Sequence, residues 1–326
     1  MNTRKLGSTG PEVYPLGLGC MGMSDMYGPA DESEGIATIH EALEAGINLV
    51  DTADFYGAGK NELLVGRALK GRRDKAILSV KFGALRGPDR GWLGQDCRPA
   101  AIKNFLAYTL QRLGVDYIDI YRPARLDPAV PIEDTVGAIA ELVKAGYVRH
   151  IGLSEISAAT LRRAAAVHPI VDVQIEYSLI SRHPEDSLFP AMAETGVAMT
   201  AYGVLSRGLL AGSKPTGPTD FRTWLPRFAG ANAVQNASLV QKLHAAAEHK
   251  GCTPSQLAIA WVLHKGAAIV PLIGARTRKQ LAESLAALRI PLTAQEVHDL
   301  ERTVPAGKVA GQRYQDQAMA HLDSEK

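Results

Sequence analysis

The stretch AILSVKFG at residues 76–83 is a short, mostly apolar run, and a segment with helical periodicity follows it at residues 99–114. A second apolar run, YIDIYR at residues 117–122, comes next and is followed by a helical segment at residues 134–146. Buried strands that alternate with helices are typical of a parallel sheet whose faces are covered by helices. This strand–helix pair is therefore predicted to be the repeating unit of the fold.

The same unit recurs on both sides of this stretch. The other predicted strands are VYPLGLG (13–19), NLVDTA (48–53), VRHIGLSE (148–155), VDVQIE (171–176), VAMTAYG (197–203) and AIVPLIG (268–274). The other predicted helical segments are 33–46, 61–70, 157–167, 185–195, 236–250 with 254–266, and 277–288. Eight such units favour an α/β fold of the (β/α)8 TIM-barrel type, in which residues 1–326 form one domain.

Three segments interrupt the regular alternation. Residues 1–12 contain Gly7 and a Gly-Pro pair, which predict a β-hairpin before the first strand, at the bottom of the barrel. Long loops follow the third and seventh strands, at residues 83–98 and 204–235. Because the C-terminal ends of the strands form the active face of such barrels, we expect both loops to shape a pocket there.

Composition excludes several classes of protein. The 326 residues include 36 Lys and Arg against 34 Asp and Glu, which is too balanced for a nucleic-acid or membrane-surface protein. The three cysteines show neither metal-ligand nor disulfide spacing, so no metal is expected. The polar N-terminus does not match a signal peptide, and no apolar run is long enough to cross a bilayer. We expect a soluble, cytoplasmic protein.

One motif points toward a different fold. Gly17-Leu-Gly19-Cys-Met-Gly22 follows a predicted strand and matches the G-x-G-x-x-G pattern of open, doubly wound dinucleotide-binding sheets. That pattern requires the glycines to open a helix whose N-terminus holds the pyrophosphate. Here a polar loop follows, and the predicted helix begins only at residue 33. The open sheet is therefore the minor alternative, and the glycines are expected to bring a loop close to the barrel mouth.

Three polar side chains are placed to converge at that mouth. Asp51 and Lys81 lie near the ends of two neighbouring predicted strands, and Tyr56 lies in the loop after the first of them. An ammonium beside a tyrosine lowers the tyrosine pKa, and a carboxylate keeps the ammonium charged. A tyrosine placed in this way can transfer a proton near neutral pH. The alternative is a structural Asp51–Lys81 ion pair with Tyr56 in a lid.

At these residues the chain resembles the aldo-keto reductase superfamily, and within it the bacterial, potassium-channel-β-like branch. The matching segments are Asp51-Thr-Ala-Asp-Phe-Tyr56-Gly57, Asn61-Glu62 with residues 65–69, Lys81, Gly152-Leu-Ser154, residues 174–178, residues 201–210 and residues 273–277. They follow in order along essentially the whole chain. The resemblance implies NADPH-dependent reduction of an aldehyde or ketone to an alcohol.

The resemblance also implies a role for each matching residue. Tyr56 would be the proton donor, Lys81 its activator and Asp51 the partner of Lys81. The implied cofactor contacts are Ser154 and Gln174 to the carboxamide, Tyr202 to the nicotinamide ring, Leu205, Arg207, Gly208, Leu210 and Lys214 to the pyrophosphate, Gly274 and Arg276 to the 2′-phosphate region, and Gln280 and Glu283 around the adenosine. An arginine fork suits phosphate, and the minor alternative is that Arg276 is a solvated residue at a helix start.

Two positions depart from the family pattern. Where the family usually has a catalytic His, shortly after the fourth strand, this chain has Ala124. Losing such a donor commonly costs on the order of 10²–10³ in rate. Either Tyr56 suffices and Ala124 makes room for substrate or water, or Arg122 or Arg125 reaches the carbonyl oxygen, or turnover is slow. The second departure is Glu155 in place of the usual Asn, because a carboxylate cannot donate to the carboxamide.

The substrate contacts are predicted from the loops around the mouth. The candidates are Met23, Tyr27, Phe55, Trp92, Arg122, Ala124, Trp224 and Phe228. An apolar and aromatic lining suits a small carbonyl compound with a hydrophobic body, although each side chain could instead pack under its own loop. Two other functions stay open: a weakly catalytic NADPH-binding sensor or regulatory subunit, and a reductase of activated C=C bonds. The sequence does not decide between a monomer and a homo-oligomer.

Overall fold

Eight parallel strands close into a barrel, as the sequence predicts, in a computed structural model that describes residues 3–24, 26–89, 91–218 and 220–326. The strands, in their order around the barrel, are β3 (Gly17–Gly19), β4 (Leu49–Ala53), β5 (Ile77–Phe82), β8 (Ile118–Pro123), β9 (Val148–Ser154), β10 (Ile170–Glu176), β11 (Ala198–Tyr202) and β12 (Ile269–Gly274). Pairing of β12 with β3 closes the ring, with Ile273 opposite Leu18. All residues of β4 and β10 are buried, which explains why these strands read as apolar runs.

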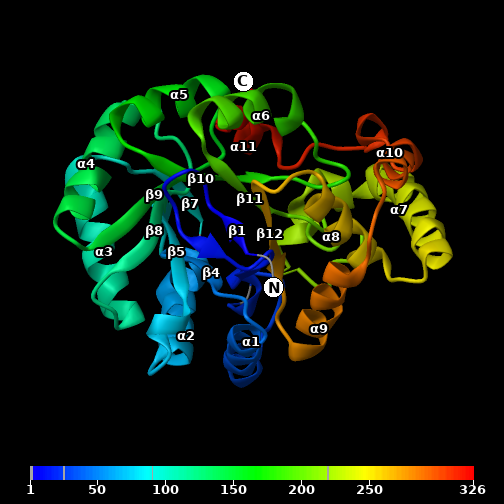
Figure 1. Cartoon of the computed structure of the whole chain (residues 1–326), viewed down its shortest axis with the longest axis horizontal. Coiled ribbons are helices and arrows are strands. Elements are labelled where there is room, and N and C mark those ends of the chain that lie inside the picture. Colours follow the sequence, from blue (N-terminus) through cyan, green and yellow to red (C-terminus); the bar gives the residue numbers. More distant parts are fainter. Residues whose placement is uncertain (1–2, 25, 90, 219) are drawn as a thin grey trace.

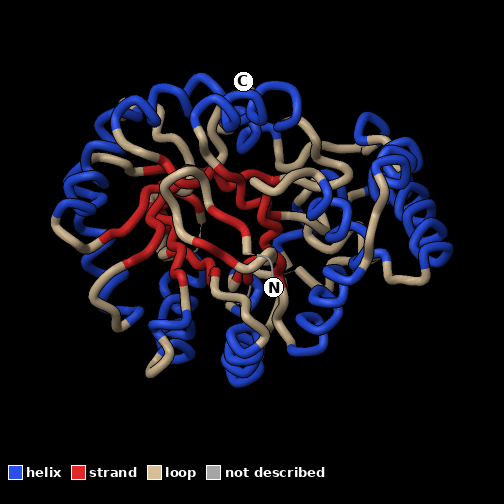
Figure 2. Tube along the Cα trace, in the orientation of Figure 1, coloured by secondary structure: helices blue, strands red, loops and turns tan. Residues whose placement is uncertain are grey.

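Helices surround the strands (Figures 1 and 2). They are α1 (Glu32–Glu44), α2 (Lys60–Leu69), α3 (Pro99–Leu113), α4 (Ile132–Lys144), α5 (Ala158–Val167), α6 (Pro184–Thr195), α7 (Gly230–Lys250), α8 (Pro254–His264), α9 (Arg278–Ala286), α10 (Ala294–Thr303) and α11 (Asp316–Ala320). Local sequence sets several of their ends. The Asp31 side chain caps α1 by accepting from the Glu34 N–H, and Thr253 with Gln256 forms a capping box on α8. Among the described residues, no helix is long and apolar enough to cross a membrane.

The predicted N-terminal hairpin is present. Its strands are β1 (Arg4–Lys5) and β2 (Glu12–Val13), and they pair antiparallel. The first predicted barrel strand therefore started too early, because Val13 belongs to this hairpin and β3 begins only at Gly17. Leu6 and Val13 are fully buried in a separate hydrophobic cluster with side chains from the barrel strands, so the hairpin closes the barrel at the end away from the strand C-termini.

The two long loops contain more structure than the sequence indicated. Residues 83–98 form a second hairpin, in which β6 (Ala84–Arg86) pairs antiparallel with β7 (Trp92–Gln95). Within 204–235 the chain forms two short 3-10 turns, and then α7 begins at Gly230, six residues before the predicted start at 236. Beyond the last predicted helix, α10, α11 and a polar C-terminal segment follow. The capping-box pattern Thr293-x-x-Glu296 is the local signal that would have revealed α10.

Candidate active site

Asp51 and Lys81 meet at the barrel mouth, because β4 and β5 run side by side with Ala53 opposite Lys81. Asp51 Oδ1 accepts a hydrogen bond from Lys81 Nζ, and both side chains are buried. Asp51 Oδ2 accepts from Ser79 Oγ at 2.8 Å and from Gln174 Nε2 at 2.9 Å. The carboxylate is thus fixed from three directions and holds the ammonium in one place.

Tyr56 lies directly beside this pair. Its side chain is buried, and Lys81 Nζ lies 5.1 Å from the centre of its ring. Burial raises the pKa of Tyr56 well above the ordinary tyrosine value, and the Asp51 charge adds to that rise. The expected lowering of the Tyr56 pKa by Lys81 is therefore not what the geometry produces. Tyr56 is protonated at neutral pH and holds a proton that it can donate.

Aromatic side chains pack next to Tyr56. The rings of Phe55 and Tyr56 lie 4.9 Å apart in an edge-to-face arrangement, and Trp92 of the β6–β7 hairpin lies 5.7 Å from Phe55. Arg86 lies over the Trp92 ring at 4.1 Å. The structure therefore brings together two of the predicted substrate contacts, Phe55 and Trp92. Trp92 is 55% exposed, so it covers the site from the solvent side.

The two residues predicted to hold the carboxamide are neighbours on β9 and β10, where Gln174 pairs in register with Ser154. Ser154 Oγ is buried and makes no hydrogen bond within the described residues. Such a hydroxyl needs a partner, and an amide group would provide one, so this position fits the nicotinamide carboxamide. Gln174 is engaged differently from the prediction, because its amide donates to Asp51.

Tyr202, predicted to cover the nicotinamide ring, ends β11. Its hydroxyl donates to Glu155 Oε1 at 2.9 Å and lies 3.0 Å from the hydroxyl of Tyr314. Sequence analysis missed Tyr314 and its neighbour Arg313. Both belong to the C-terminal segment. No motif marks them, because only the course of the chain after α10 brings them to the site.

The turn after β11, where the pyrophosphate contacts are predicted, has a tight left-handed backbone. Ser206, Arg207 and Gly208 all have positive φ, and a Cβ on Gly208 would lie 3.0 Å from that of Ser213. Most N–H groups of this turn are used within it, since those of Ser206, Gly208 and Leu209 donate to the carbonyls of Gly203, Leu205 and Ser206. The Arg222 guanidinium holds the turn in shape, since it donates to the carbonyls of residues 207 and 214. Sequence analysis missed Arg222.

Two predicted phosphate contacts of this turn point elsewhere. The Arg207 side chain forms an ion pair with Glu176 at 2.8 Å, so only its backbone is available to a phosphate. Lys214 is exposed, and its backbone carbonyl accepts a hydrogen bond from Arg222 Nη2 at 3.1 Å. Leu210 is buried beneath the turn and Leu205 is partly buried, so these two shape the turn through packing.

The segment after β12 presents Arg276 at the mouth. Arg276 Nη1 donates to the Tyr27 carbonyl at 3.1 Å, and its backbone N–H donates to Gln280 Oε1 at 2.9 Å. Gly274, at the end of β12, is exposed, as a close approach of a ligand to the backbone requires. Glu283 is turned away from this group, because it accepts from Thr253 Oγ1 at 2.8 Å.

The loops after β3 and β11 join across the mouth. Tyr27 forms an antiparallel bridge with Asp220, and its ring lies 6.4 Å from that of Phe221. Of the predicted substrate contacts in these loops, Met23 is buried in the main hydrophobic core, and Trp224 is 67% exposed. The Phe228 ring is partly buried and packs against that core.

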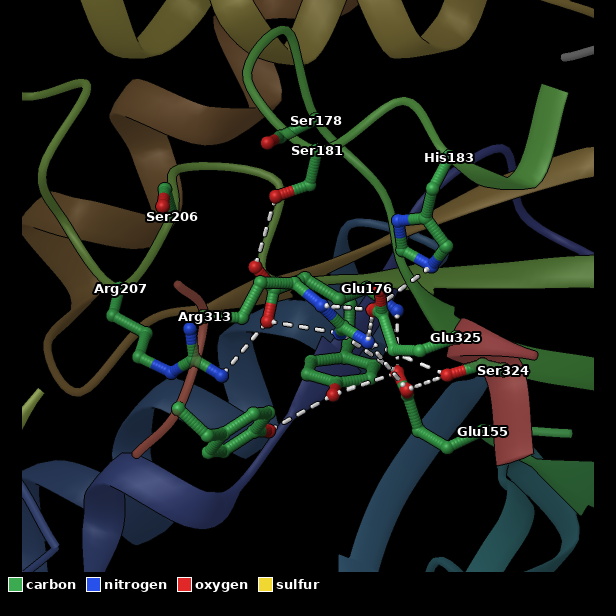
Figure 3. Close-up of polar contacts among 12 residues, drawn as sticks. Glu155, Glu176, Ser178, Ser181, His183, Ser206, Arg207, Arg313, Ser324 and Glu325 are labelled. Carbon is green, nitrogen blue, oxygen red and sulfur yellow. Dashed lines mark hydrogen bonds and ion pairs between the residues drawn. The ribbon is translucent and has the colours of Figure 1, made fainter. Parts of the chain in front are cut away.

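A second charged cluster lies at the same end of the barrel, and we call it the C-terminal lock. It consists of Glu155, Glu176, Arg207, Arg313 and Glu325, which Figure 3 labels, together with Arg227. Arg313 donates to Glu155 at 2.9 Å, to Glu176 at 3.4 Å and to Glu325 at 2.5 Å. The C-terminal segment is thereby tied to the ends of β9 and β10. Glu155 faces this cluster and also accepts from the Ser324 hydroxyl.

The arginines of the lock set the acidity of its carboxyl groups. Burial by itself raises the pKa of Glu155 and Glu176, but their arginine neighbours outweigh it. The pKa of Glu155 falls well below its ordinary value, with Arg313 as the main cause, and that of Glu176 falls to about 2, with Arg207 first among the causes. Both carboxyl groups are therefore ionised at neutral pH.

The end of β8 carries the position at which the family pattern is broken. Ala124 is buried, and its N–H donates to the Phe82 carbonyl at 2.8 Å. Arg122 is fully buried and pairs with Asp172 at 2.8 Å and with Ser79 Oγ at 3.0 Å, so its charge is neutralised inside the barrel. Arg125 behaves differently, since it donates to the Ala124 carbonyl and to the Tyr314 hydroxyl.

Comparisons with known proteins agree with this geometry. The family model of the aldo/keto reductase family matches residues 15–304. A curated relative, "Probable aldo-keto reductase 1" from Glycine max, is 42% identical over 317 residues, which cover 95% of this chain and 91% of that protein. The chain belongs to the aldo/keto reductase family.

Solved structures show the same architecture. The glycerol dehydrogenase AKR11B4 from Gluconobacter oxydans superposes with a TM-score of 0.83 at 28% identity, covering 93% of this chain and 96% of that one. The holo form of aldo-keto reductase AKR11C1 from Bacillus halodurans superposes with a TM-score of 0.77 at 31% identity, covering 94% and 97%. Family membership supports an oxidoreductase that uses a nicotinamide cofactor on small carbonyl compounds.

Proposed function

We propose that this protein reduces an aldehyde or ketone to an alcohol with NADPH, and that Tyr56 is the proton donor. The observation that carries the proposal is the buried Asp51–Lys81 pair beside a protonated Tyr56, with Lys81 Nζ 5.1 Å from the tyrosine ring. When bound, NADPH supplies the hydride for the carbonyl carbon. Ser154, with its unpartnered hydroxyl, would hold the carboxamide.

The chain's own residues account for the proton. As negative charge develops on the carbonyl oxygen, the Tyr56 hydroxyl donates its proton to that oxygen. The Lys81 ammonium stabilises the tyrosinate that remains, in a site where burial strengthens the attraction. Asp51 keeps Lys81 in position and opposes the loss of its proton, since burial lowers the pKa of Lys81 and Asp51 raises it.

The test is NADPH oxidation at 340 nm with a panel of aldehydes, ketones, 1,2-dicarbonyls and activated alkenes. Tyr56→Phe is expected to lower kcat by roughly 10²- to 10⁴-fold, because the proton donor is lost. Tyr108→Phe, which alters a tyrosine that is 53% exposed on α3, serves as the matched control and is expected to keep full activity. Turnover that survives in Tyr56→Phe would contradict the proposed role of Tyr56. Turnover restricted to alkenes would replace carbonyl reduction with C=C reduction.

Ala124 favours a second candidate function. An alanine cannot donate to the carbonyl oxygen, so a slow, cofactor-binding regulatory protein is the alternative. Ala124→His, measured in the same assay, separates the two. A rise in rate would show that the missing donor limits catalysis, whereas a fall would show that the small side chain makes room for substrate. Tight NADPH binding without turnover on any substrate would favour the regulatory function.

The preference for NADPH over NADH is assigned to Arg276. Its guanidinium is held by the Tyr27 carbonyl and faces no carboxylate within ion-pair distance among residues 3–24, 26–89, 91–218 and 220–326. Arg276→Met is expected to weaken NADPH binding by roughly 10- to 100-fold, and NADH binding far less, because NADH lacks the phosphate. Fluorescence titration with both cofactors measures this. Equal losses for the two cofactors would remove the assignment.

A further inference from the structure

Arg125 stands apart from the other buried arginines at the barrel mouth. Their carboxylate partners lie at ion-pair distance: Arg122 with Asp172 at 2.8 Å, Arg207 with Glu176 at 2.8 Å, Arg222 with Asp220 at 2.7 Å, Arg227 with Glu176 at 3.4 Å and Arg313 with Glu155 at 2.9 Å. Arg125 has no such partner in the part of the chain that the structure describes. Arg125 is thus the member of this group without a carboxylate at ion-pair distance, and Glu155 acts on its charge only from farther away.

The contacts that Arg125 does make hold it in place without neutralising it. Nη1 donates to the Ala124 carbonyl at 2.6 Å, and Nη2 donates to the Tyr314 hydroxyl at 3.3 Å. The guanidinium carbon also lies 5.9 Å from the centre of the Tyr314 ring. These acceptors are neutral, and a guanidinium has further N–H donors beyond the two in use. A fixed, partly buried cation with free donors is what an anionic ligand group requires.

The position of Arg125 connects it to the reacting centre. It follows Ala124, whose N–H is bonded to the carbonyl of Phe82, the residue after Lys81. On its other side, the Tyr314 hydroxyl lies 3.0 Å from that of Tyr202. Arg125 thus lies between the strand that carries Lys81 and the tyrosine that is predicted to cover the nicotinamide.

The electrostatics agree with this placement. Burial and the Asp51 charge raise the pKa of Tyr56, and Arg125 is the cation that opposes this rise. Burial also lowers the pKa of Lys81, and Arg125 contributes to that lowering. The charge of Arg125 is therefore felt at both residues of the proton-transfer pair.

Arg276 provides an internal comparison. It too is anchored by a backbone carbonyl, that of Tyr27, and it too has no carboxylate partner among the described residues. An anionic group of the cofactor explains such an arginine on the β12 side of the mouth. On the β8 side, where Arg125 lies, the substrate is the molecule that can bring the anion.

We propose that Arg125 forms an anion subsite beside Tyr56, so that the preferred substrates are aldehydes or ketones that carry a carboxylate or a phosphate group. This inference rests on the proposed reductase function and names its substrate class. Tyr314 is the positioning residue of the subsite, because it holds one nitrogen of the guanidinium through a neutral hydroxyl.

The experiment compares substrates of matched shape that differ in charge. The carboxylate arm sets 4-formylbenzoate against 4-formylbenzamide, and the phosphate arm sets glyceraldehyde 3-phosphate against glyceraldehyde. We expect kcat/KM to favour the charged member of one arm by roughly 10- to 100-fold, as a charge-assisted hydrogen bond provides. The arm that shows the preference identifies the anion.

Variants then test whether Arg125 causes the preference. Arg125→Gln is expected to abolish the preference, so that the charged and neutral members of the pair have equal kcat/KM in this variant. Tyr314→Phe is expected to reduce the preference by a few-fold, because the guanidinium loses one fixed contact. Arg162→Gln, which removes the same charge from an exposed pair with Glu194 on α5, is the control and should preserve the preference.

Two outcomes would overturn the inference. One is equal kcat/KM for charged and neutral substrates in the wild type. The other is an equal loss for both substrates in Arg125→Gln, which would place the guanidinium on the carbonyl oxygen. Calorimetric titration with benzoate, in wild type and in Arg125→Gln, gives a readout that does not depend on turnover. Benzoate binding that requires Arg125, in a protein that reduces nothing, would support the subsite and contradict the proposed function.

Discussion

Two groups of buried charges lie at the same end of the barrel, and they are built on opposite rules. In the C-terminal lock, each buried carboxylate faces arginines, as Glu155 faces Arg313 and Glu176 faces Arg207. On the catalytic side, Lys81 neutralises Asp51, but the nearby Asp54 has no cation within ion-pair distance among the described residues. The lock is therefore electrostatically satisfied, and the catalytic side is not.

The difference appears in the direction of the pKa shifts. Arginines lower the pKa of Glu155 and Glu176 in spite of burial, whereas burial raises the pKa of Asp54 to about 7 and that of Tyr56 far above its ordinary value. Perturbed groups of the second kind are typical of functional sites. We infer that the lock serves stability and that the catalytic side gives up stability for chemistry. The following predictions test this division.

The largest expected effect belongs to the lock. Arg313→Met should lower the free energy of unfolding by about 3–5 kcal/mol, because it leaves Glu155 buried without its arginine, whereas Glu176 keeps Arg207 and Arg227. Chemical denaturation at neutral pH measures the change. Adding Glu155→Gln to this variant removes the unpaired charge and should restore part of the loss.

A matched arginine on the surface provides the control. Arg163→Met breaks an exposed pair with Glu133 at 2.6 Å and should leave the free energy of unfolding nearly unchanged, because solvent screens the pair. If Arg313→Met cost no more than this surface variant, the lock would have no special role in stability. A large loss of activity with unchanged stability would instead move Arg313 to the catalytic side.

The second prediction concerns acid. Because the folded-state pKa of Glu176 is about 2, below the ordinary value, its contribution to stability is complete above about pH 5 and disappears as the pH falls toward 2. For a fully buried group this amounts to roughly 3 kcal/mol. Urea denaturation between about pH 6 and pH 3 should show a smaller pH dependence in Glu176→Gln than in wild type. Parallel pH profiles for the two proteins would contradict the lowered pKa.

The sequence predicted one of these two regions and missed the other, for a physical reason. Asp51 and Lys81 each lie on a barrel strand, and closure of the barrel brings the ends of neighbouring strands together. Once the strands are identified, the proximity of Asp51 and Lys81 can therefore be predicted. Ser154 and Gln174 were placed in the same way, and the fold itself was predicted because the apolar runs and helices alternate.

The contacts of the C-terminal lock could not be predicted from the positions of the strands. Arg313 and Tyr314 lie in a polar segment with no periodicity, and only the path of the chain after α10 brings them to Glu155. Similarly, nothing local shows that Arg207 pairs with Glu176 or that Gln174 donates to Asp51. Strand ends are set by topology, whereas the partner of a long side chain is set by packing and by competing charges.

The third prediction concerns the buried pair on the catalytic side. Burial lowers the pKa of Lys81 and the Asp51 charge opposes this, so Asp51→Asn should lower the Lys81 pKa further. Lys81 would then lose its proton at a lower pH, and the alkaline limb of the kcat profile should move in the same direction. Initial rates between about pH 6 and pH 10 measure this. An unmoved limb would show that the Lys81 charge is not required for turnover.

The smallest effect is expected at Asp54, and its sign is opposite to that of the lock. Burial and the nearby Glu62 raise the pKa of Asp54 to about 7. Asp54 therefore ionises more readily in the unfolded chain than in the folded protein, and this difference lowers the free energy of unfolding as the pH rises. This penalty is absent below about pH 4 and complete above about pH 7. Asp54→Asn should therefore raise the free energy of unfolding by about 1–2 kcal/mol at pH 8, discounted for partial exposure, and by much less at pH 4. Denaturation at both pH values measures the difference, and Asp116→Asn, which alters an exposed carboxylate, is the control. If Asp54→Asn were instead less stable than wild type at pH 8, the Asp54 carboxylate would have a partner that stabilises its charge.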